Sequence, residues 1–305
     1  MNESLYYSQQ ERGSILSIIN KHVRNCKFHD SLGDVTERDM VWIKWNNNNG
    51  ISFIAGQENW ITRLHNLIAP KRNEQTTLYH FKSAEIGLKI LSTKLIQLSA
   101  LSDKYFNDYA ELTEYHKRYA NDGMFPDHQL NDYKYFIYVL CMTKDKSNDY
   151  FWNEFNNHSD KICFKFVILN ILNHRSIQFN DMFYDSGYDL DFLNDIRHDI
   201  KENFGLRIKY QSLRSHWAPY FYKRGKFNVE NESRLAINYF HLPIELKNNK
   251  LIKGNEERYF IELPFKNEFF SLRIEEITIS STLSSEMKIS FKEICKTDNI
   301  TLVEI

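Results

Sequence analysis

Charged and apolar residues alternate along one stretch of the chain, KFNVENESRLAI (residues 226–237). Glu230, Glu232 and Arg234 occupy every second position there, and the side chains of a strand alternate between its two faces. The pattern therefore predicts a strand that carries both carboxylates and the guanidinium on one face. That face is either the solvated side of a half-buried strand or the lining of a catalytic cleft.

Short apolar runs rich in β-branched and aromatic residues predict further strands. These runs are LYHF (78–81), LIQLSA (95–100), YFIYVLCMT (135–143), KICFKFVIL (161–169), RYFIELPF (258–265), LRIEEITIS (272–280) and the terminal ITLVEI. Apolar residues at helical spacing predict helices over 84–91, 191–205 and 285–294. Helices separate the early strands and the later part is mostly strand, so we expect an α+β fold around a mixed, mainly antiparallel sheet.

The first 75 residues form a separate pattern. A helix is predicted over 11–23, then a hairpin in which VWIKW and ISFIAG flank the turn NNNNG, and then a short helix over 58–67. The polar stretch PKRNEQ (70–75) is the predicted boundary. We therefore expect an N-terminal extension, residues 1–75, with a regulatory or partner-binding role, and a main domain over residues 76–305.

The composition narrows the class of protein. Lys and Arg total 39 against 40 Asp and Glu, a balance that gives no overall attraction to nucleic acid or to an anionic membrane. The four cysteines are far apart and form no C-x-x-C pair, which favours a reduced cytoplasmic protein over a disulfide or zinc framework. The N-terminal residues lack the pattern of a signal peptide, and the most apolar run, 162–172, is too short to span a bilayer. We expect a cytoplasmic protein with no membrane segment.

Several common active-site motifs are absent from the sequence. The chain has ten glycines and contains neither a P-loop nor a G-x-G-x-x-G motif, which argues against a P-loop ATPase, a protein kinase or a Rossmann dehydrogenase. No H-E-x-x-H or G-x-S-x-G occurs, and the spacing of the histidines and cysteines predicts no metal site. The segment IELK (244–247) has the E-x-K spacing of some metal-dependent nucleases and is the sequence support for that alternative.

One ordered set of segments resembles a bacterial family. The set runs from Tyr79 and His80 in LYHF, through LIQLSA and FNDYAE with Phe106, Asn107, Asp108 and Glu111, to LCMT, FWNEF with Trp152, and finally Lys223, Phe227, Glu230, Glu232 and Arg234. In this order the segments resemble the bacterial domain-of-unknown-function family 2971, over about residues 76–305. The chain departs from the family pattern at Lys82, Tyr109 and Phe227, where a small hydroxyl residue, a proline and a tryptophan are usual.

The layout of that family is similar to that of the ADP-ribosyltransferases, which cleave the nicotinamide–ribose bond of NAD. The likeness concerns the fold. It implies that Glu232 stabilises the positive charge that develops on the ribose, and that Glu230 orients or deprotonates the acceptor. It also implies that His80 holds a ribose hydroxyl or the nicotinamide amide.

The same resemblance assigns the remaining contacts with NAD, which would be the substrate. Tyr79 would line the site beside His80, and Tyr105 or Phe106 would stack on the nicotinamide ring. Arg234 would orient the glutamates or bind a phosphate. Structural interpretations remain open for His80 as a hydrogen-bonded core residue, for Trp152 as a core residue and for FNDYAE as a helix cap.

Three functions therefore compete. The leading hypothesis is an NAD-consuming ADP-ribosyltransferase-like enzyme, a bacterial toxin or phage-defence effector, acting on an unidentified protein or nucleic acid and controlled by an antitoxin or regulatory protein. A metal-dependent nuclease is the second. The third is a nucleotide-sensing or interaction module without catalytic activity.

Overall fold

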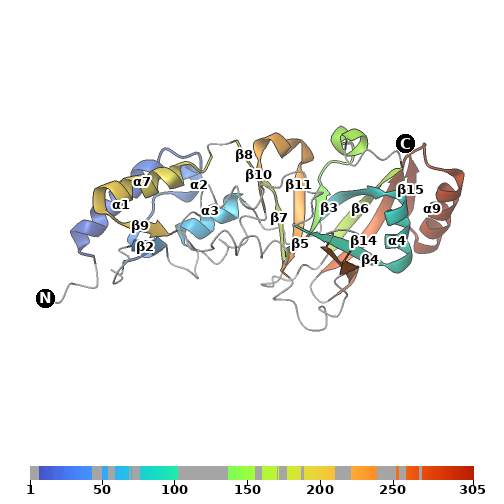
Figure 1. Ribbon diagram of the computed structural model, residues 1–305, viewed down its shortest axis with the longest axis horizontal. Helices are drawn as coiled ribbons and strands as arrows, with labels where there is room; N and C mark the ends of the chain where they lie inside the picture. Colours follow the sequence, from blue (N-terminus) through green and yellow to red (C-terminus); the bar gives the residue numbers. More distant parts are fainter. Residues whose placement is uncertain are drawn as a thin grey trace. The chain divides into compact units, whose positions relative to one another are not determined.

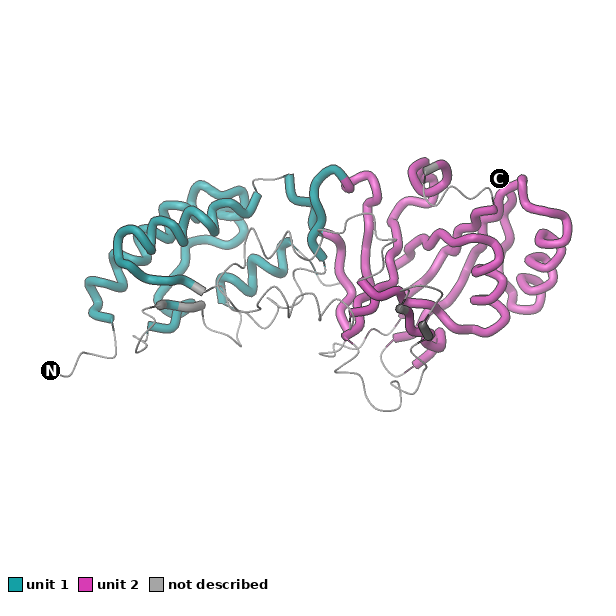
Figure 2. The backbone as a smooth tube through the Cα atoms, in the orientation of Figure 1, with its two compact units in different colours: residues 1–70, 110–130, 183–226 teal, residues 71–109, 131–182, 227–305 magenta. Residues whose placement is uncertain are grey.

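The chain is divided into two compact units, coloured separately in Figure 2. The computed structural model describes residues 7–42, 50–53, 59–68, 70, 76–101, 137–154, 160–169, 171, 177–186, 189–209, 221–238, 252–253, 259–267 and 270–305. Unit 1 comprises residues 1–70, 110–130 and 183–226, and unit 2 comprises residues 71–109, 131–182 and 227–305. This division differs from the single boundary predicted after residue 75, because unit 1 also includes residues 110–130 and 183–226.

Unit 1 is built from two long helices and a small sheet. Helix α1 (Gln9–Val23) packs against α7 (Phe192–Phe204), and the sheet has the strand order β1 (Met40–Val41), β2 (Gly50–Phe53), β9 (Arg207–Lys209). The strands β1 and β2 are antiparallel, which confirms the predicted pairing on either side of the Asn-rich turn, while β9 joins β2 in parallel. Residues 43–49, which include most of that turn, lie outside the described residues.

The smaller elements of unit 1 complete it. They are α2 (His29–Leu32), the 3-10 turn η1 (Glu37–Asp39), α3 (Trp60–Ile68), and the parallel pair β8 (Phe183–Asp185) and β10 (Tyr222–Arg224). Sequence signals explain the ends of the two long helices. Ser8 and Glu11 form a capping box at the start of α1, and Gly205 ends α7 in the left-handed conformation that glycine tolerates best, with φ of 64°.

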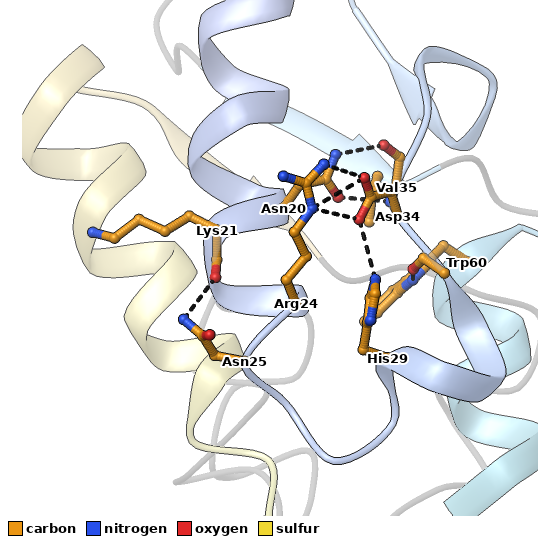
Figure 3. A network of polar contacts seen from close by, with 9 residues as sticks. Asn20, Lys21, Arg24, Asn25, His29, Asp34, Val35 and Trp60 are labelled. Atoms are coloured by element: carbon orange, nitrogen blue, oxygen red, sulfur yellow. Dashed lines mark hydrogen bonds and ion pairs between the residues drawn. The ribbon is translucent and has the colours of Figure 1, made fainter.

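A polar network holds α1 to the loop that follows α2 (Figure 3). The side chain of Asn20 donates to the carbonyl of Val35 at 2.9 Å and accepts from its N–H at 2.7 Å. Arg24 forms a bidentate pair with Asp34, whose carboxylate also lies 3.3 Å from Nε2 of His29. The charged groups are therefore paired with one another, and we interpret the network as structural.

Unit 2 contains a large sheet (Figure 1). Its strand order is β12 (Ile252–Lys253), β13 (Tyr259–Pro264), β4 (Leu95–Ala100), β5 (Ile137–Thr143), β3 (Thr76–Ser83), β6 (Lys161–Leu169), β14 (Ser271–Ile279) and β15 (Thr301–Glu304). Off this path, β11 (Glu232–Asn238) pairs with β5 and with β7 (Ile177–Asp181). The described pairs in this sheet are antiparallel except for β14 with β15, so the predicted α+β class with a mainly antiparallel sheet is confirmed.

Two helices cover one face of this sheet, which we call the helix face. Helices α4 (Ala84–Thr93) and α9 (Ser285–Asp298) contact each other and contribute to the main apolar core with residues from β3, β4, β5, β6, β11 and β14. Gly87 of α4 lies so close to the sheet that a Cβ there would be 2.0 Å from Cδ1 of Ile162. The opposite face carries the residues between the core positions, and we call it the polar face.

Strand β5 is the point at which the sheet divides. One edge of β5 pairs with β11 along its whole length, from Ile137 to Thr143. Along its other edge, β4 pairs at Tyr138 and Val139, whereas β3 pairs at Thr143. Cys141 therefore lies between the two branches. Among the described residues, no helix has both the length and the apolar character needed to cross a bilayer.

Candidate active site

The stretch with alternating charges is a strand only in its second half. Strand β11 begins at Glu232, and the residues before it form the 3-10 turn η5 (Gly225–Glu230). Asn231 joins the two with a φ of 43°, in the left-handed region that asparagine tolerates better than most residues. The prediction that Glu230 shares a strand face with Glu232 is therefore wrong, because the backbone changes conformation between them. Glu230 is nevertheless buried, at 4% exposed.

The strand itself is central and fully buried. All seven residues of β11 are buried, because β5 and β7 pair with its two edges and both of its faces are covered. The solvated, half-buried face is therefore the wrong interpretation of this stretch. A carboxylate and a guanidinium on a buried strand require partners, since an uncompensated buried charge is strongly unfavourable.

Glu232 and Arg234 are partners for each other. Nε of Arg234 donates to Oε1 of Glu232 at 2.6 Å, and Nη2 donates to Oε2 at 3.3 Å. The two residues are two positions apart on one strand, so both side chains lie on the same face. Arg234 is 0% exposed and Glu232 is 3% exposed. The bidentate geometry fixes the orientation of the carboxylate.

Strand register places other polar residues in line with Glu232. Residues directly opposite each other in antiparallel strands have side chains on the same face. The pairs Glu276↔Lys165, Lys165↔Tyr79, Tyr79↔Thr143 and Thr143↔Glu232 connect five strands, β14, β6, β3, β5 and β11. We call these five residues the polar row. Tyr79 and Glu232 are two strand spacings apart, about 10 Å between backbones.

Ion pairs occupy the far end of the polar row. A β-bulge between Ile274 and Glu276 places Glu275 beside Lys165, with Oε2 and Nζ 3.1 Å apart. Nζ of Lys146 donates to Oε1 of Glu276 at 2.6 Å, and this hydrogen bond lowers the pKa of that carboxyl. The pKa of Glu275 is also lowered, by its hydrogen bonds with Arg273 and then Lys165.

His80 lies on the other face of the sheet from Glu232. It follows Tyr79 on β3, so its side chain points to the helix face, where its ring lies 5.7 Å from that of Phe166. Nδ1 of His80 is 2.8 Å from the carbonyl oxygen of Cys141, the residue between the two branches of the sheet. The ring forms a hydrogen bond with a carbonyl group at the point where β3 and β4 separate. This hydrogen bond explains why a polar residue interrupts an apolar strand.

The surroundings of His80 keep the imidazole neutral. Burial, together with the positive charge of Lys82, lowers the pKa of His80 to about 3, although the hydrogen bond to Cys141 acts in the opposite direction. Because Nδ1 faces a carbonyl oxygen, Nδ1 carries the hydrogen and Nε2 has the lone pair. Nε2 is buried and has no hydrogen-bond partner in the structure as described. The structure therefore does not bring His80 and Glu232 together as a catalytic pair.

Of the other residues predicted for the site, some lie outside the described residues and some are described. Tyr105, Phe106, Asn107, Asp108, Glu111 and the segment IELK lie outside the described residues. Trp152 packs edge-on against Phe81, with ring centroids 4.9 Å apart, and its Nε1 donates to the carbonyl of Lys146 at 2.9 Å. Lys223 is buried in unit 1 and Phe227 belongs to η5. Within the described ranges, no group of three or more His, Cys, Asp or Glu side chains could hold a metal ion.

Sequence reasoning did not identify Thr143, Lys165, Lys146 and Glu276 as parts of one surface. One signal was present in KICFKFVIL, where Lys161 and Lys165 share a face of an otherwise apolar strand. No family model, no curated protein and no solved structure matches this chain. The resemblance to domain-of-unknown-function family 2971 therefore remains a prediction.

Proposed function

We propose that unit 2 is an ADP-ribosyltransferase-like enzyme that cleaves the nicotinamide–ribose bond of NAD on its polar face. The observation that supports this most is the buried, bidentate pair of Glu232 and Arg234, which lies in line with Thr143 and Tyr79 across the sheet. A carboxylate held rigidly on a polar sheet face is what the reaction needs. A structural strand would be expected to carry apolar residues at such central positions.

The proposed chemistry assigns the main role to Glu232. Cleavage of the glycosidic bond passes through an oxocarbenium-like state, and a carboxylate near the ribose hydroxyls stabilises the positive charge as it develops. The two hydrogen bonds from Arg234 hold this carboxylate in one orientation. Arg234 would be a positioning residue that orients the carboxylate of Glu232.

On β3, we assign the contact with NAD to Tyr79 and no longer to His80. In the proposal, Tyr79 contacts the nicotinamide or ribose, because it shares the polar face with Glu232. His80 is a structural residue on the helix face. Glu230 is kept as the group that orients the acceptor, and the acceptor is a protein or a nucleic acid. A toxin or phage-defence role, with an antitoxin or regulatory partner, is part of the same proposal.

The proposal is tested by following nicotinamide release from NAD in the presence of cell extract. Tyr79→Phe removes one hydroxyl from a half-buried residue and should reduce release while leaving the melting temperature close to that of the wild type. Glu232→Gln should abolish release, but it also breaks a buried ion pair, so its rate must be expressed per folded molecule. Arg234→Lys keeps the charge and should retain part of the activity.

Two results would contradict the proposal. Release that persists in folded Glu232→Gln would show that this carboxylate is not catalytic. Binding of NAD to the wild type without any release of nicotinamide would favour the non-catalytic nucleotide-sensing module.

A further inference from the structure

One segment of unit 2, Lys144–Glu154, lies over part of the polar face, and we call it the strap. It follows β5 and ends in the π-helical turn η2 (Tyr150–Glu154). The ring of Phe151 stacks on that of Phe81 at 5.1 Å with an interplanar angle of 12°, and Trp152 packs on Phe81 from the side. Phe81 is on the polar face, opposite Cys163 of β6. The strap therefore covers the β3 and β6 part of that face.

Besides the aromatic packing on Phe81, polar contacts attach the strap to the sheet. The strap has two described ion pairs with the sheet, Lys146 with Glu276 at 2.6 Å and Lys144 with Asp181 at 2.8 Å, and all four side chains are partly exposed. Partly exposed ion pairs of this kind contribute little to stability. Nδ2 of Asn148 donates to the carbonyl of Val229 at 2.6 Å, which connects the strap to the turn that precedes Glu232. A movement of the strap would thus change access to the polar row.

Lys161 is the unusual residue beneath the strap. Its side chain is buried, at 6% exposed, and no carboxylate in the described residues forms an ion pair with it. Its ammonium group donates to the carbonyl oxygen of Trp152 at 2.9 Å, and burial lowers its pKa. A buried ammonium with a carbonyl as acceptor is poorly compensated. When the strap moves away, it takes this carbonyl with it.

We propose that the strap is a gate over a binding subsite for a phosphate-bearing ligand, in which Lys161 is the cation that meets the phosphate. In the closed state the carbonyl oxygen of Trp152 stands where an oxygen of the ligand would bind. The ion pair between Lys146 and Glu276 helps to hold the strap in the closed state. The inference rests on the proposed function for one point, the identity of the ligand, since NAD carries a pyrophosphate. The gate and the subsite are otherwise independent of catalysis.

Opening of the gate can be measured by the reactivity of a buried thiol. Cys163 faces Phe81 beneath the strap and is 1% exposed, so a thiol reagent reaches it only after opening. Cys295 lies in α9 in the core on the helix face and reports opening of the core instead. Two proteins, each retaining one of these cysteines and alanine at the other three cysteine positions, provide a matched pair of probes.

We expect Lys146→Met to increase the labelling rate of Cys163 by about two- to five-fold, the change in open population that a partly exposed ion pair controls. The charge of Lys146 acts to lower the pKa of Cys163, so its loss would by itself slow the labelling, and an increase reports opening. The labelling rate of Cys295 should remain unchanged. A parallel increase at both cysteines would mean that the substitution destabilises unit 2 as a whole, and it would overturn the gate.

Binding of inorganic pyrophosphate tests the subsite by calorimetry. If the ligand binds only the open state, Lys146→Met should raise its apparent affinity by up to the same factor as the labelling rate of Cys163, although the substitution removes a positive charge. Lys161→Met should abolish binding in both backgrounds, whereas Lys89→Met, which removes an exposed lysine of α4, should leave it unchanged. Pyrophosphate binding that survives Lys161→Met, or no binding to any variant, would overturn the subsite.

The two proposals fail separately. Nicotinamide release with an unchanged KM for NAD in Lys161→Met would keep the proposed function and overturn the subsite. Pyrophosphate binding that depends on Lys161, without nicotinamide release by any protein, would keep the subsite and overturn the enzyme.

Discussion

Acidification should weaken unit 2 through His80, and the effect can be isolated with one substitution. The imidazole is 5% exposed, and its pKa is about 3 in the folded protein because burial and the charge of Lys82 disfavour the cation. Asparagine at this position keeps an N–H donor close to the place of Nδ1 and does not titrate. The comparison of wild type with His80→Asn therefore separates the titration of the ring from its hydrogen bond to Cys141.

The magnitude follows from the two pKa values. His80 has a folded pKa near 3 and an unfolded pKa of about 6.5, so below 6.5 the unfolded chain binds a proton that the folded protein excludes. Stability is therefore fully present above pH 6.5 and is lost as the pH falls toward 3. Each pH unit in this window corresponds to about 1.4 kcal/mol, so the loss at pH 5 is about 2 kcal/mol relative to pH 7.

Urea unfolding followed by circular dichroism at pH 7 and pH 5 measures this difference. Other groups titrate in both proteins, so the relevant quantity is the wild-type loss minus the loss in His80→Asn, expected to be about 2 kcal/mol. His80→Leu serves as a control: like His80→Asn it does not titrate, but it removes the donor to Cys141, so it should be about 1–3 kcal/mol less stable than His80→Asn at both pH values. Identical pH dependence in wild type and His80→Asn would refute the reasoning, because it would mean that His80 accepts a proton in the folded protein.

Further predictions concern the site and the ends of elements. Arg234→Met leaves the carboxylate of Glu232 buried without its guanidinium and should cost about 3–5 kcal/mol in urea unfolding, whereas Arg234→Met with Glu232→Gln should be more stable than the sum of the single variants predicts. A double variant no more stable than that sum would show that the pair is not coupled. Asn231→Gly should change the melting temperature little, while Asn231→Val should cost about 1–2 kcal/mol because a β-branched residue is strained at φ of 43°; equal stability of the two variants would contradict the left-handed turn. Ser8→Ala removes one half of the capping box with Glu11 and should lower the stability of unit 1 by about 1 kcal/mol, which hydrogen exchange of the first turn of α1 would detect. Unchanged exchange there would show that the cap does not hold the helix end.

Local periodicity predicted most elements of unit 2 correctly. The apolar runs at 95–100 and 161–169 are β4 and β6, and the helical patterns near 84–91 and 285–294 are α4 and α9. Such elements can be predicted because their periodicity depends on residues that are close in sequence. The strand predicted through 226–231 was wrong for a local reason too, since Asn231 in the left-handed region ends η5 before the strand begins.

The division into units could not be predicted in the same way. The sequence contains a polar stretch near residue 70 that is typical of a boundary, but it carries no sign that residues 183–226 return to the first unit. That return depends on contacts such as those of α1 with α7, whose residues are far apart along the chain. Loop closure of this kind leaves no periodic pattern in the sequence.

The sequence by itself determined the α+β class, the positions of most strands and helices, and the placement of Glu232 and Arg234 two residues apart in one strand. The tertiary structure alone decided which residues meet. It brings Tyr79 and Thr143 into line with Glu232, and it turns His80 to the opposite face. The physical reason is that the register between distant strands decides which side chains are neighbours, and a shift of one residue moves every side chain to the other face of the sheet.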